Sequence, residues 1–152
     1  MQLHPQKHPL ERHTTIDWRH LDDQELPEDF HNTAITDLVL EAGDVLFIDS
    51  SHVVRVSNDV AHLFCRIIPS LKPGVVVHVH DVFLPFEYPK RFFYDCPGWG
   101  EQYMLHAILQ SGSFSMLWPG YFLQKMRPDV VEALPFLKDG RAQSIWVQIK
   151  EN

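Results

Sequence analysis

Acidic and imidazole side chains follow two short apolar segments of the sequence, at the point where each segment ends. They are Asp49, His52, His80 and Asp81. The residues between the two segments are spaced as in one helix, so the whole span predicts a strand–helix–strand crossover. Ligands of open α/β sheets bind at the carboxyl ends of the strands, and neighbouring strands lie about 5 Å apart. We therefore expect the four groups to meet at one rim and form a site.

Three roles are open for these groups. Asp49, His80 and Asp81 could hold a divalent cation through oxygen and imidazole ligands. His52 or Asp81 could instead act as a general base toward a substrate hydroxyl. In a purely structural interpretation, the two aspartates only cap the following loop or helix through backbone N–H groups. A ligand or catalytic contact is favoured over capping alone.

The pair His78-Val-His80 is also a feature of metallohydrolases. Residues two apart on a strand share a face, so both imidazoles could reach one ion. Such an enzyme needs further ligands, however, and Asp81 directly follows His80 where a His-x-His-x-Asp-His motif would not have it. His78 is therefore expected to be a hydrogen-bonded core histidine.

A long aromatic and proline-rich loop, residues 82–97, follows the second strand, and a helix is expected from Glu101 onward. A carboxylate in a first helical turn is favoured by the helix dipole. Alternatively, this segment folds over the rim as a lid, and Glu101 then faces substrate. The loop aromatics are expected to pack the loop onto the domain. They are Phe83, Phe86, Tyr88, Phe92, Phe93 and Tyr94.

The remaining elements follow from apolar periodicity and from turn residues. Strands are expected at residues 14–18, 45–48, 75–79, 114–118 and 144–150. Helices are expected at residues 27–40, 60–68 and 101–110, and at 121–137 with interruptions at Pro128 and Pro135. The apolar side of the helix at 101–110 would carry Tyr103, Met104, Ala107 and Ile108. Residues 1–13 have no periodic signal and are expected to be a loose lead-in to a single domain spanning residues 1–152.

Composition narrows the possible partners and the compartment. The net charge of −7 disfavours binding to a nucleic-acid backbone. No apolar segment approaches the roughly 20 residues that span a bilayer, and the amino-terminal residues do not resemble a signal peptide. Two cysteines make no disulfide framework, and Cys65, within an apolar helical pattern, is expected to be buried. A cytoplasmic protein that binds a small molecule, and neither a membrane nor nucleic acid, fits best.

Four motifs in order resemble the second half of a class I S-adenosylmethionine-dependent methyltransferase. They are Asp44-Val-Leu-Phe-Ile-Asp-Ser-Ser-His52, Leu71-Lys-Pro-Gly74, Val79-His-Asp-Val-Phe83 and Trp99-Gly-Glu-Gln-Tyr103. The resemblance implies a three-layer, Rossmann-like α/β fold with a mostly parallel sheet, here a partial one with strands in the order 4-5-7-6. It also implies methyl transfer from S-adenosylmethionine to a small-molecule oxygen or nitrogen acceptor.

The resemblance also implies roles for individual residues. Gln24 and Glu25 fall where a loop approaches the cofactor's adenine, and Asp49 falls beside its methionine part. His52, His80 and Asp81 fall at the acceptor or metal position, with His52 or Asp81 removing the acceptor's proton. Substrate contacts would come from Glu101 and His80, and a divalent metal, if bound, from Asp49, His80 and Asp81.

The chain departs from this family at its beginning. No glycine-rich cofactor loop precedes Asp44, and the first glycine of the chain is Gly43. We therefore expect an incomplete chain, in which the strand at residues 45–48 has an open edge. Such an edge recruits another strand, either by self-association into a homo-oligomer or by capture of residues 14–18. A truncated, non-catalytic domain that self-associates, and less favoured a His-x-His metallohydrolase, remain alternatives to the methyltransferase.

Overall fold

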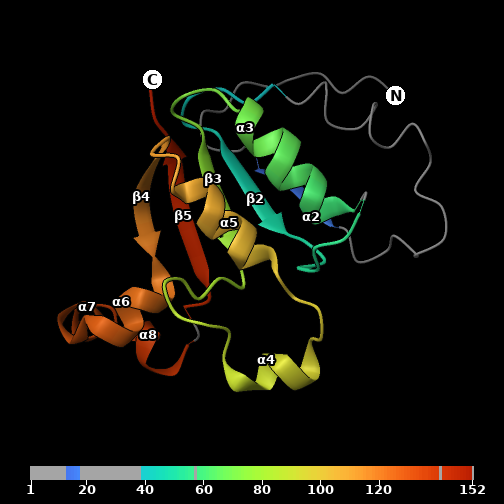
Figure 1. Cartoon of the computed structure of the whole chain (residues 1–152). Coiled ribbons are helices and arrows are strands. Elements are labelled where there is room, and N and C mark those ends of the chain that lie inside the picture. Colours follow the sequence, from blue (N-terminus) through green and yellow to red (C-terminus); the bar gives the residue numbers. More distant parts are fainter. Residues whose placement is uncertain (1–12, 18–38, 57, 141, 152) are drawn as a thin grey trace, which may run out of the picture.

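The computed structural model describes residues 13–17, 39–56, 58–140 and 142–151, and its centre is a five-stranded sheet (Figure 1). The strands are β1 (His13–Asp17), β2 (Val45–Asp49), β3 (Val76–His80), β4 (Phe114–Pro119) and β5 (Ser144–Ile149). Their order is β1-β2-β3-β5-β4. β1, β2 and β3 are parallel, whereas β5 is antiparallel to both of its neighbours, β3 and β4. The predicted α/β class is confirmed, and four strands follow the expected order 4-5-7-6.

One helical segment connects β2 to β3, and it consists of α2 (Asp59–His62), a π-helical turn η1 (Leu63–Ile67) and α3 (Ile68–Ser70). Asn58 caps it by accepting a hydrogen bond from the Ala61 backbone N–H. The residues predicted to form its inner side are buried, and they are Val60, Leu63, Phe64, Ile67 and Ile68. The prediction of a buried Cys65 is wrong, because this position lies off that apolar stripe and the side chain is exposed.

A glycine turn fixes the start of β3. Gly74 has a φ of +86°, and a Cβ there would lie 2.6 Å from the Cβ of Ala42. Its carbonyl accepts a hydrogen bond from the Gly43 backbone N–H, which ties together the turns that precede β2 and β3. With Val45 paired to Val76, the two strands end side by side, since Ile48 is paired to Val79.

The two faces of the sheet differ. Alternate residues of β2, β3 and β5 are buried in one core with the crossover helix and with α5 (Glu101–Leu109), which lies on the same face (Figure 1). On the opposite face, the rings of Phe47, His78 and Trp146 form a row across three strands. The helix expected at residues 27–40 lies almost entirely outside the described residues.

The apolar side of α5 differs from the prediction. Its fully buried residues are Glu101, Gln102 and Leu105. Met104 and Ile108 pack against the core as expected, but Tyr103 is 46% exposed. The turn carrying Glu101 and Gln102 is buried because it lies against the rim at the strand ends, a tertiary contact that periodicity does not reveal.

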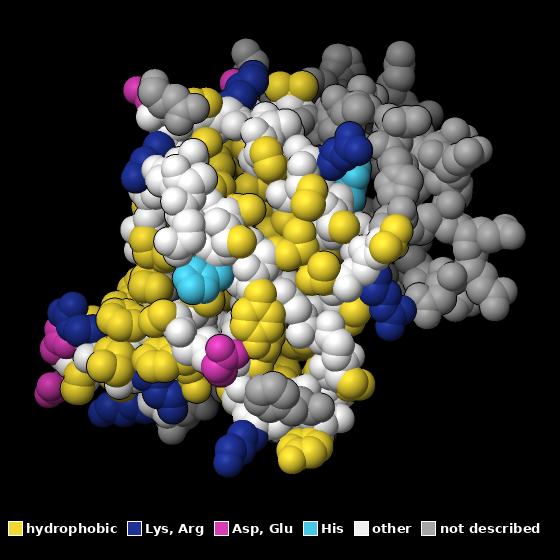
Figure 2. All heavy atoms as spheres, viewed as in Figure 1, with side chains coloured by type: hydrophobic (Ala, Val, Ile, Leu, Met, Phe, Trp, Pro, Cys, Tyr) yellow, Lys and Arg dark blue, Asp and Glu magenta, His cyan; other side chains and the backbone are white. Residues whose placement is uncertain are grey.

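Short helices form the carboxyl-terminal part and the loop after β3 (Figure 1). They are α4 (Lys90–Asp95), α6 (Gly120–Met126), α7 (Pro128–Ala133) and α8 (Phe136–Asp139). As predicted, Pro128 and Pro135 mark the interruptions, since each opens or precedes a new helix. Figure 2 shows hydrophobic side chains gathered over the region of β4 and α6–α8. The exposed ones there include Met116, Leu117, Met126 and Phe136.

The edge of β2 is occupied by β1, in a parallel register from His13 with Val45 to Asp17 with Asp49. Capture of the predicted strand at residues 14–18 is therefore what the structure contains, and self-association stays a prediction. The lead-in expected at residues 1–13 lies outside the described residues except for His13, which belongs to β1. Among the helices that the structure describes, none has the length and apolar character needed to cross a bilayer.

Candidate functional site

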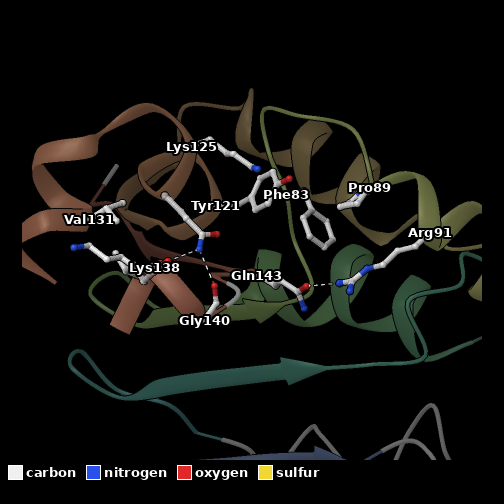
Figure 3. A pocket seen from close by; sticks show the side chains of 11 residues that line it. Phe83, Pro89, Arg91, Tyr121, Lys125, Val131, Lys138, Gly140 and Gln143 are labelled. Carbon is white, nitrogen blue, oxygen red and sulfur yellow. Dashed lines mark hydrogen bonds between the residues drawn. The ribbon is translucent and has the colours of Figure 1, made fainter. Parts of the chain in front are cut away.

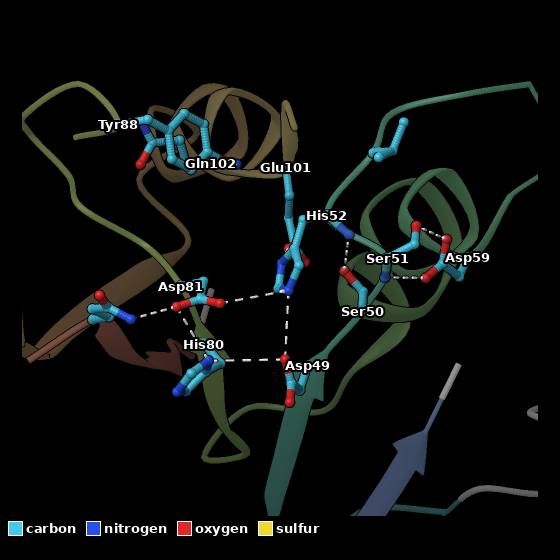
Figure 4. A network of polar contacts seen from close by, with 12 residues as sticks. Asp49, Ser50, Ser51, His52, Asp59, His80, Asp81, Tyr88, Glu101 and Gln102 are labelled. Carbon is cyan, nitrogen blue, oxygen red and sulfur yellow. Dashed lines mark hydrogen bonds and ion pairs between the residues drawn. The ribbon is translucent and has the colours of Figure 1, made fainter. Parts of the chain in front are cut away.

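The carboxyl ends of β2 and β3 bring together the acidic and imidazole groups singled out in the sequence (Figure 4). Asp49 ends β2, His80 ends β3, and Asp81 follows directly. One ligand atom from each of these three residues lies within 4.8 Å of the others. The predicted convergence of the two strand ends is therefore present, and we call this cluster, together with His52 and Glu101, the acidic crevice.

His52 is the central group of the acidic crevice (Figure 4). Its Nδ1 lies 2.6 Å from Oε2 of Glu101, and its Nε2 lies 3.5 Å from Oδ1 of Asp49 and 3.8 Å from Oδ2 of Asp81. The ring of Trp99 lies against the imidazole, with a centroid distance of 4.2 Å. His52 is 7% exposed and Glu101 is 1% exposed. The imidazole is therefore held in one orientation, with Nδ1 toward Glu101 and Nε2 toward the aspartates.

The loop after β2 is locked in an uncommon conformation. His52 has a φ of +59°, in the left-handed region that few residues without a glycine's freedom adopt. Its backbone N–H donates to Oγ of Ser50, and its carbonyl accepts from the N–H groups of Gly100 and Glu101. Backbone strain that persists at a site is held by surrounding contacts. The same bonds bring the start of α5 to the rim.

Ser51 anchors this loop to the crossover helix. Its backbone N–H and its hydroxyl both donate to the carboxylate of Asp59, at 2.7 and 2.6 Å. Asp59 is therefore a structural residue that fixes the loop between Asp49 and His52. Neither contact was predicted from the sequence.

Asp81 is fixed from the other side of the crevice by residues that the sequence analysis missed. Its φ is +53°, and its Oδ1 accepts a hydrogen bond of 2.7 Å from Nε2 of Gln143. Arg91 donates in turn to Oε1 of Gln143, also at 2.7 Å. Gln143 comes 62 residues after Asp81 and reaches it only because β5 lies beside β3. No spacing in the sequence could have indicated this contact.

The charges of the crevice favour a proton on His52. Burial alone lowers the pKa of His52, but the hydrogen bond to Glu101 and the charges of Glu101, Asp81 and Asp49 outweigh it, so the pKa is raised. Burial raises the pKa of Glu101, and the contact with His52 partly opposes this. Both groups are therefore stabilised when one proton lies between Nδ1 and Oε2.

His80 and Asp81 form a second coupled pair. The adjacent Asp81 carboxylate raises the pKa of His80, and burial only partly opposes this effect. For Asp81, burial acts to raise the pKa, but His80, His52 and the Gln143 hydrogen bond together lower it. Asp81 is therefore a carboxylate at neutral pH, which is the state a metal ligand or a proton acceptor needs.

The residues at the rim fit a divalent cation. Nδ1 of His80 is buried without a hydrogen-bond partner among the described residues, 3.8 Å from Oδ1 of Asp49 and 3.5 Å from Oδ1 of Asp81. Two carboxylates and one imidazole form a donor set that several divalent cations accept. Asp49, His80 and Asp81 are thus the residues that could hold such an ion.

His78 is not part of this donor set among the described residues. Its ring is stacked on Trp146 at a centroid distance of 4.0 Å and lies 4.9 Å from the ring of Phe47. Burial and the charge of His80 lower its pKa to about 4. The expectation of a hydrogen-bonded core histidine is wrong, because the ring is held by stacking on the face opposite the core and its Nε2 has no hydrogen-bond partner in the described part of the chain. The structure therefore gives a His-x-His metal site no support.

Not every predicted residue can be placed at the site. Gln24 and Glu25, expected near the adenine of a cofactor, lie outside the described residues. Glu101 does lie over the rim, but its carboxylate is buried against His52. A role in orienting His52 fits this position better than the predicted contact with substrate.

Polar groups at the carboxyl ends of adjacent parallel strands lie where open α/β domains bind their ligands. A family model described as a methyltransferase domain matches residues 6–82, which is half of the chain and ends just after Asp81. The chain therefore belongs to this family of methyltransferase domains, whose members in general use S-adenosylmethionine. The comparisons with curated proteins and with solved structures returned no match.

Proposed function

We propose that this protein transfers a methyl group from S-adenosylmethionine to an oxygen or nitrogen atom of a small molecule, with His52 as the general base. The observation that carries the proposal is the contact of 2.6 Å between Nδ1 of His52 and the buried Glu101 carboxylate. A histidine held in this way has a fixed tautomer and a fixed direction, as a base must have.

His52 works through its second nitrogen. The base is the neutral form of His52, in which Nδ1–H donates to Glu101 and Nε2 carries the lone pair and faces the crevice between Asp49 and Asp81. It would take the proton of the acceptor's O–H or N–H group as that atom bonds to the methyl carbon, while the methyl–sulfur bond breaks and the neutral thioether S-adenosylhomocysteine leaves. The carboxylates of Asp49 and Asp81 stabilise the imidazolium that forms. Glu101 is a positioning residue, since it acts through His52.

The acidic side chains at this rim suit the positive charge of the cofactor. Bound S-adenosylmethionine supplies a methyl group on a positively charged sulfur. Three carboxylates, those of Asp49, Asp81 and Glu101, surround the crevice and favour a cationic ligand. Among the residues that the structure describes, Asp49 at the end of β2 would lie beside the bound cofactor. We assign the binding of a divalent cation to Asp49, His80 and Asp81, where the ion would hold an acceptor oxygen.

The test removes the base and keeps the shape of the side chain. His52→Asn should lower methyl transfer from labelled S-adenosylmethionine by about 10²- to 10⁴-fold, the usual contribution of a general base. The matched control is His106→Asn, because His106 is an exposed histidine on α5. Activity is measured on the full chain against a panel of small hydroxyl and amino compounds.

Calorimetry with S-adenosylmethionine separates the alternatives. Micromolar binding to the unaltered chain supports the methyltransferase and argues against a non-catalytic domain. Absence of binding and of methyl transfer would favour the non-catalytic domain. Full activity of His52→Asn would contradict the role of His52 alone.

A further inference from the structure

A cavity of about 580 Å³ lies beside the acidic crevice, between the loop around α4 and the helices α6–α8 (Figure 3). Its volume is in the range of small-molecule sites. Phe83 and Gln143 line it, and the same Gln143 donates to Asp81 in the crevice. The cavity and the crevice therefore share a wall. We call this cavity the cationic pocket, for the charges described next.

The charges lining the cationic pocket are all positive. Among the residues that the structure describes, its lining includes Arg91, Lys125 and Lys138 and no aspartate or glutamate. This is unusual in a chain with a net charge of −7. Within the residues that the structure describes, Lys125 and Lys138 form no ion pair; Nζ of Lys125 lies 5.4 Å from the centroid of the Tyr121 ring. The Lys125 ammonium group is thus available to a ligand, whereas that of the exposed Lys138 points away from the other lining side chains (Figure 3) and reaches a ligand by a change of rotamer.

The pocket is held in shape by polar contacts between its helices. Nε2 of Gln124 on α6 donates to the carbonyls of Leu137 and Gly140, at 2.6 and 2.7 Å. This side chain ties α8 to α6, and it places Lys138 and Lys125 on walls of one cavity (Figure 3).

Apolar and aromatic side chains complete the lining. Phe83 and Tyr121 meet edge to face, with a centroid distance of 5.0 Å, and Val131 and Leu137 lie nearby on α7 and α8. A ligand for this pocket therefore has an apolar or aromatic body. Its charged group is a carboxylate or a phosphate, because arginine and lysine side chains bind both.

We propose that the cationic pocket binds the anionic group of the methyl acceptor, whose reacting atom then lies at the acidic crevice next to Gln143 and Asp81. The assignment to an acceptor rests on the proposed function, but the binding of an organic anion does not. Arg91 contributes twice, since it lines the pocket and also donates to Gln143, which holds Asp81.

The experiment measures the binding of simple anions to the full chain, without cofactor or turnover. Benzoate and phenyl phosphate are titrated by calorimetry or by chemical-shift changes, with benzamide as the uncharged analogue of benzoate. Both anions, or one of them, should bind saturably and benzamide at least about tenfold more weakly, equivalent to about 1.4 kcal/mol. The stronger anion identifies the acceptor's charged group.

A pair of variants assigns the binding to the pocket. Lys125→Gln combined with Lys138→Gln should weaken the anion about tenfold, whereas Lys90→Gln should leave it unchanged. Lys90 is an exposed lysine on α4 that does not line the pocket, so it removes the same kind of charge nearby. Raised salt should weaken binding to the unaltered chain, because exposed charges are screened.

Three results would overturn the proposal: no saturable binding of either anion, equal binding of benzamide, or equal losses in the double variant and in Lys90→Gln. These results are independent of methyl transfer. Anion binding that persists in a chain without methyltransferase activity would leave the pocket assigned and the proposed function wrong. If the chain transfers methyl groups but binds no anion, the proposed function stands and the assignment of the pocket is wrong.

Discussion

The acidic crevice and the cationic pocket share Gln143, yet they are built in opposite ways. In the crevice, His52 and Glu101 are almost fully buried, and two residues, His52 and Asp81, adopt left-handed backbone conformations held by hydrogen bonds. In the pocket, Lys138 is exposed and neither lysine forms an ion pair among the described residues. One region has its geometry fixed before any ligand arrives, and the other leaves long charged side chains free to adapt.

This difference matches what the two regions are proposed to do. A proton acceptor must be within hydrogen-bond reach of its target in a defined direction, so it requires a rigid setting. A group that only holds a charge works through lysine side chains, which gain their contacts when the ligand binds. The comparison therefore predicts that substitutions in the crevice reduce stability much more than substitutions in the pocket.

The largest expected effect is on Glu101. Glu101→Ala leaves the buried imidazole of His52 without its partner and should lower the free energy of unfolding by about 3 kcal/mol. Lys138→Ala should change it by less than about 0.5 kcal/mol. Urea unfolding of both variants measures the difference. Glu101→Gln keeps a hydrogen-bond acceptor, so a smaller loss is expected there, together with a lower pKa of His52 in an NMR titration.

Equal losses for Glu101→Ala and Lys138→Ala would remove the contrast between a fixed and an adaptable region. An unchanged His52 pKa in Glu101→Gln would show that the contact between Nδ1 and Oε2 does not control the base.

A smaller effect is expected at the shared residue, Gln143. Gln143→Met removes the hydrogen bond to Oδ1 of Asp81 and should weaken the binding of Mn²⁺ about tenfold, since partners that orient metal ligands contribute 10- to 100-fold. Gln148→Met is the matched control, because Gln148 lies on β5, the strand that begins directly after Gln143, but bonds to the carbonyl of Gly74, at the opposite end of β3. Binding is followed by electron paramagnetic resonance of free Mn²⁺.

If the unaltered chain binds no Mn²⁺, the assignment of a cation to Asp49, His80 and Asp81 is wrong. If it binds Mn²⁺ and Gln143→Met binds equally well, Asp81 does not depend on Gln143 for its orientation.

The sequence predicted the position of the crevice for physical reasons. Apolar segments of four to five residues, separated by one helical span, favour a crossover between adjacent parallel strands, whose carboxyl ends then meet. Asp49, His80 and Asp81 follow from that rule alone. The helix interruptions at Pro128 and Pro135 could also be predicted from the sequence, since proline lacks the backbone N–H that a helix interior needs.

Other features depend on contacts between distant parts of the chain. Gln143 and Arg91 carry no motif, and they reach Asp81 only once β5 is placed beside β3. The burial of Glu101 follows from the hydrogen bonds of the Gly100 and Glu101 backbone N–H groups to the His52 carbonyl. Glu101 was expected to face substrate from a lid, but its carboxylate contacts His52 instead. Local periodicity contains no information about either contact.

A still smaller effect, this time on stability, is expected at His78, a histidine that lies outside the acidic crevice. His78 lies on β3 two residues before His80 and shares its face, but aromatic rings surround it instead of carboxylates. Its pKa in the folded chain is about 4, below its ordinary value of 6.5, because burial and the charge of His80 disfavour the protonated form. The pKa of His80, beside Asp81, is shifted in the opposite direction.

The sign of the pH effect follows from proton uptake. Between pH 6.5 and about 4, the unfolded chain binds a proton at His78 that the folded chain does not, so the free energy of unfolding falls as the pH falls. The contribution of His78 is complete above pH 6.5 and is lost toward pH 4. The contributions of His52 and His80, with raised pKa values, are present below 6.5 and are lost as the pH rises through their folded values.

His78→Phe keeps the ring between Phe47 and Trp146 and removes the titration. A pKa shift of this size corresponds to ~3 kcal/mol for a fully buried group. His78 is only partly buried, so we expect a smaller effect. Between pH 7 and pH 4.5, the free energy of unfolding should fall by about 1 kcal/mol less in the variant than in the unaltered chain. Thermal unfolding across this pH range, with exposed His106→Phe as control, measures it. Parallel pH profiles for the unaltered chain and His78→Phe would contradict the lowered pKa of His78.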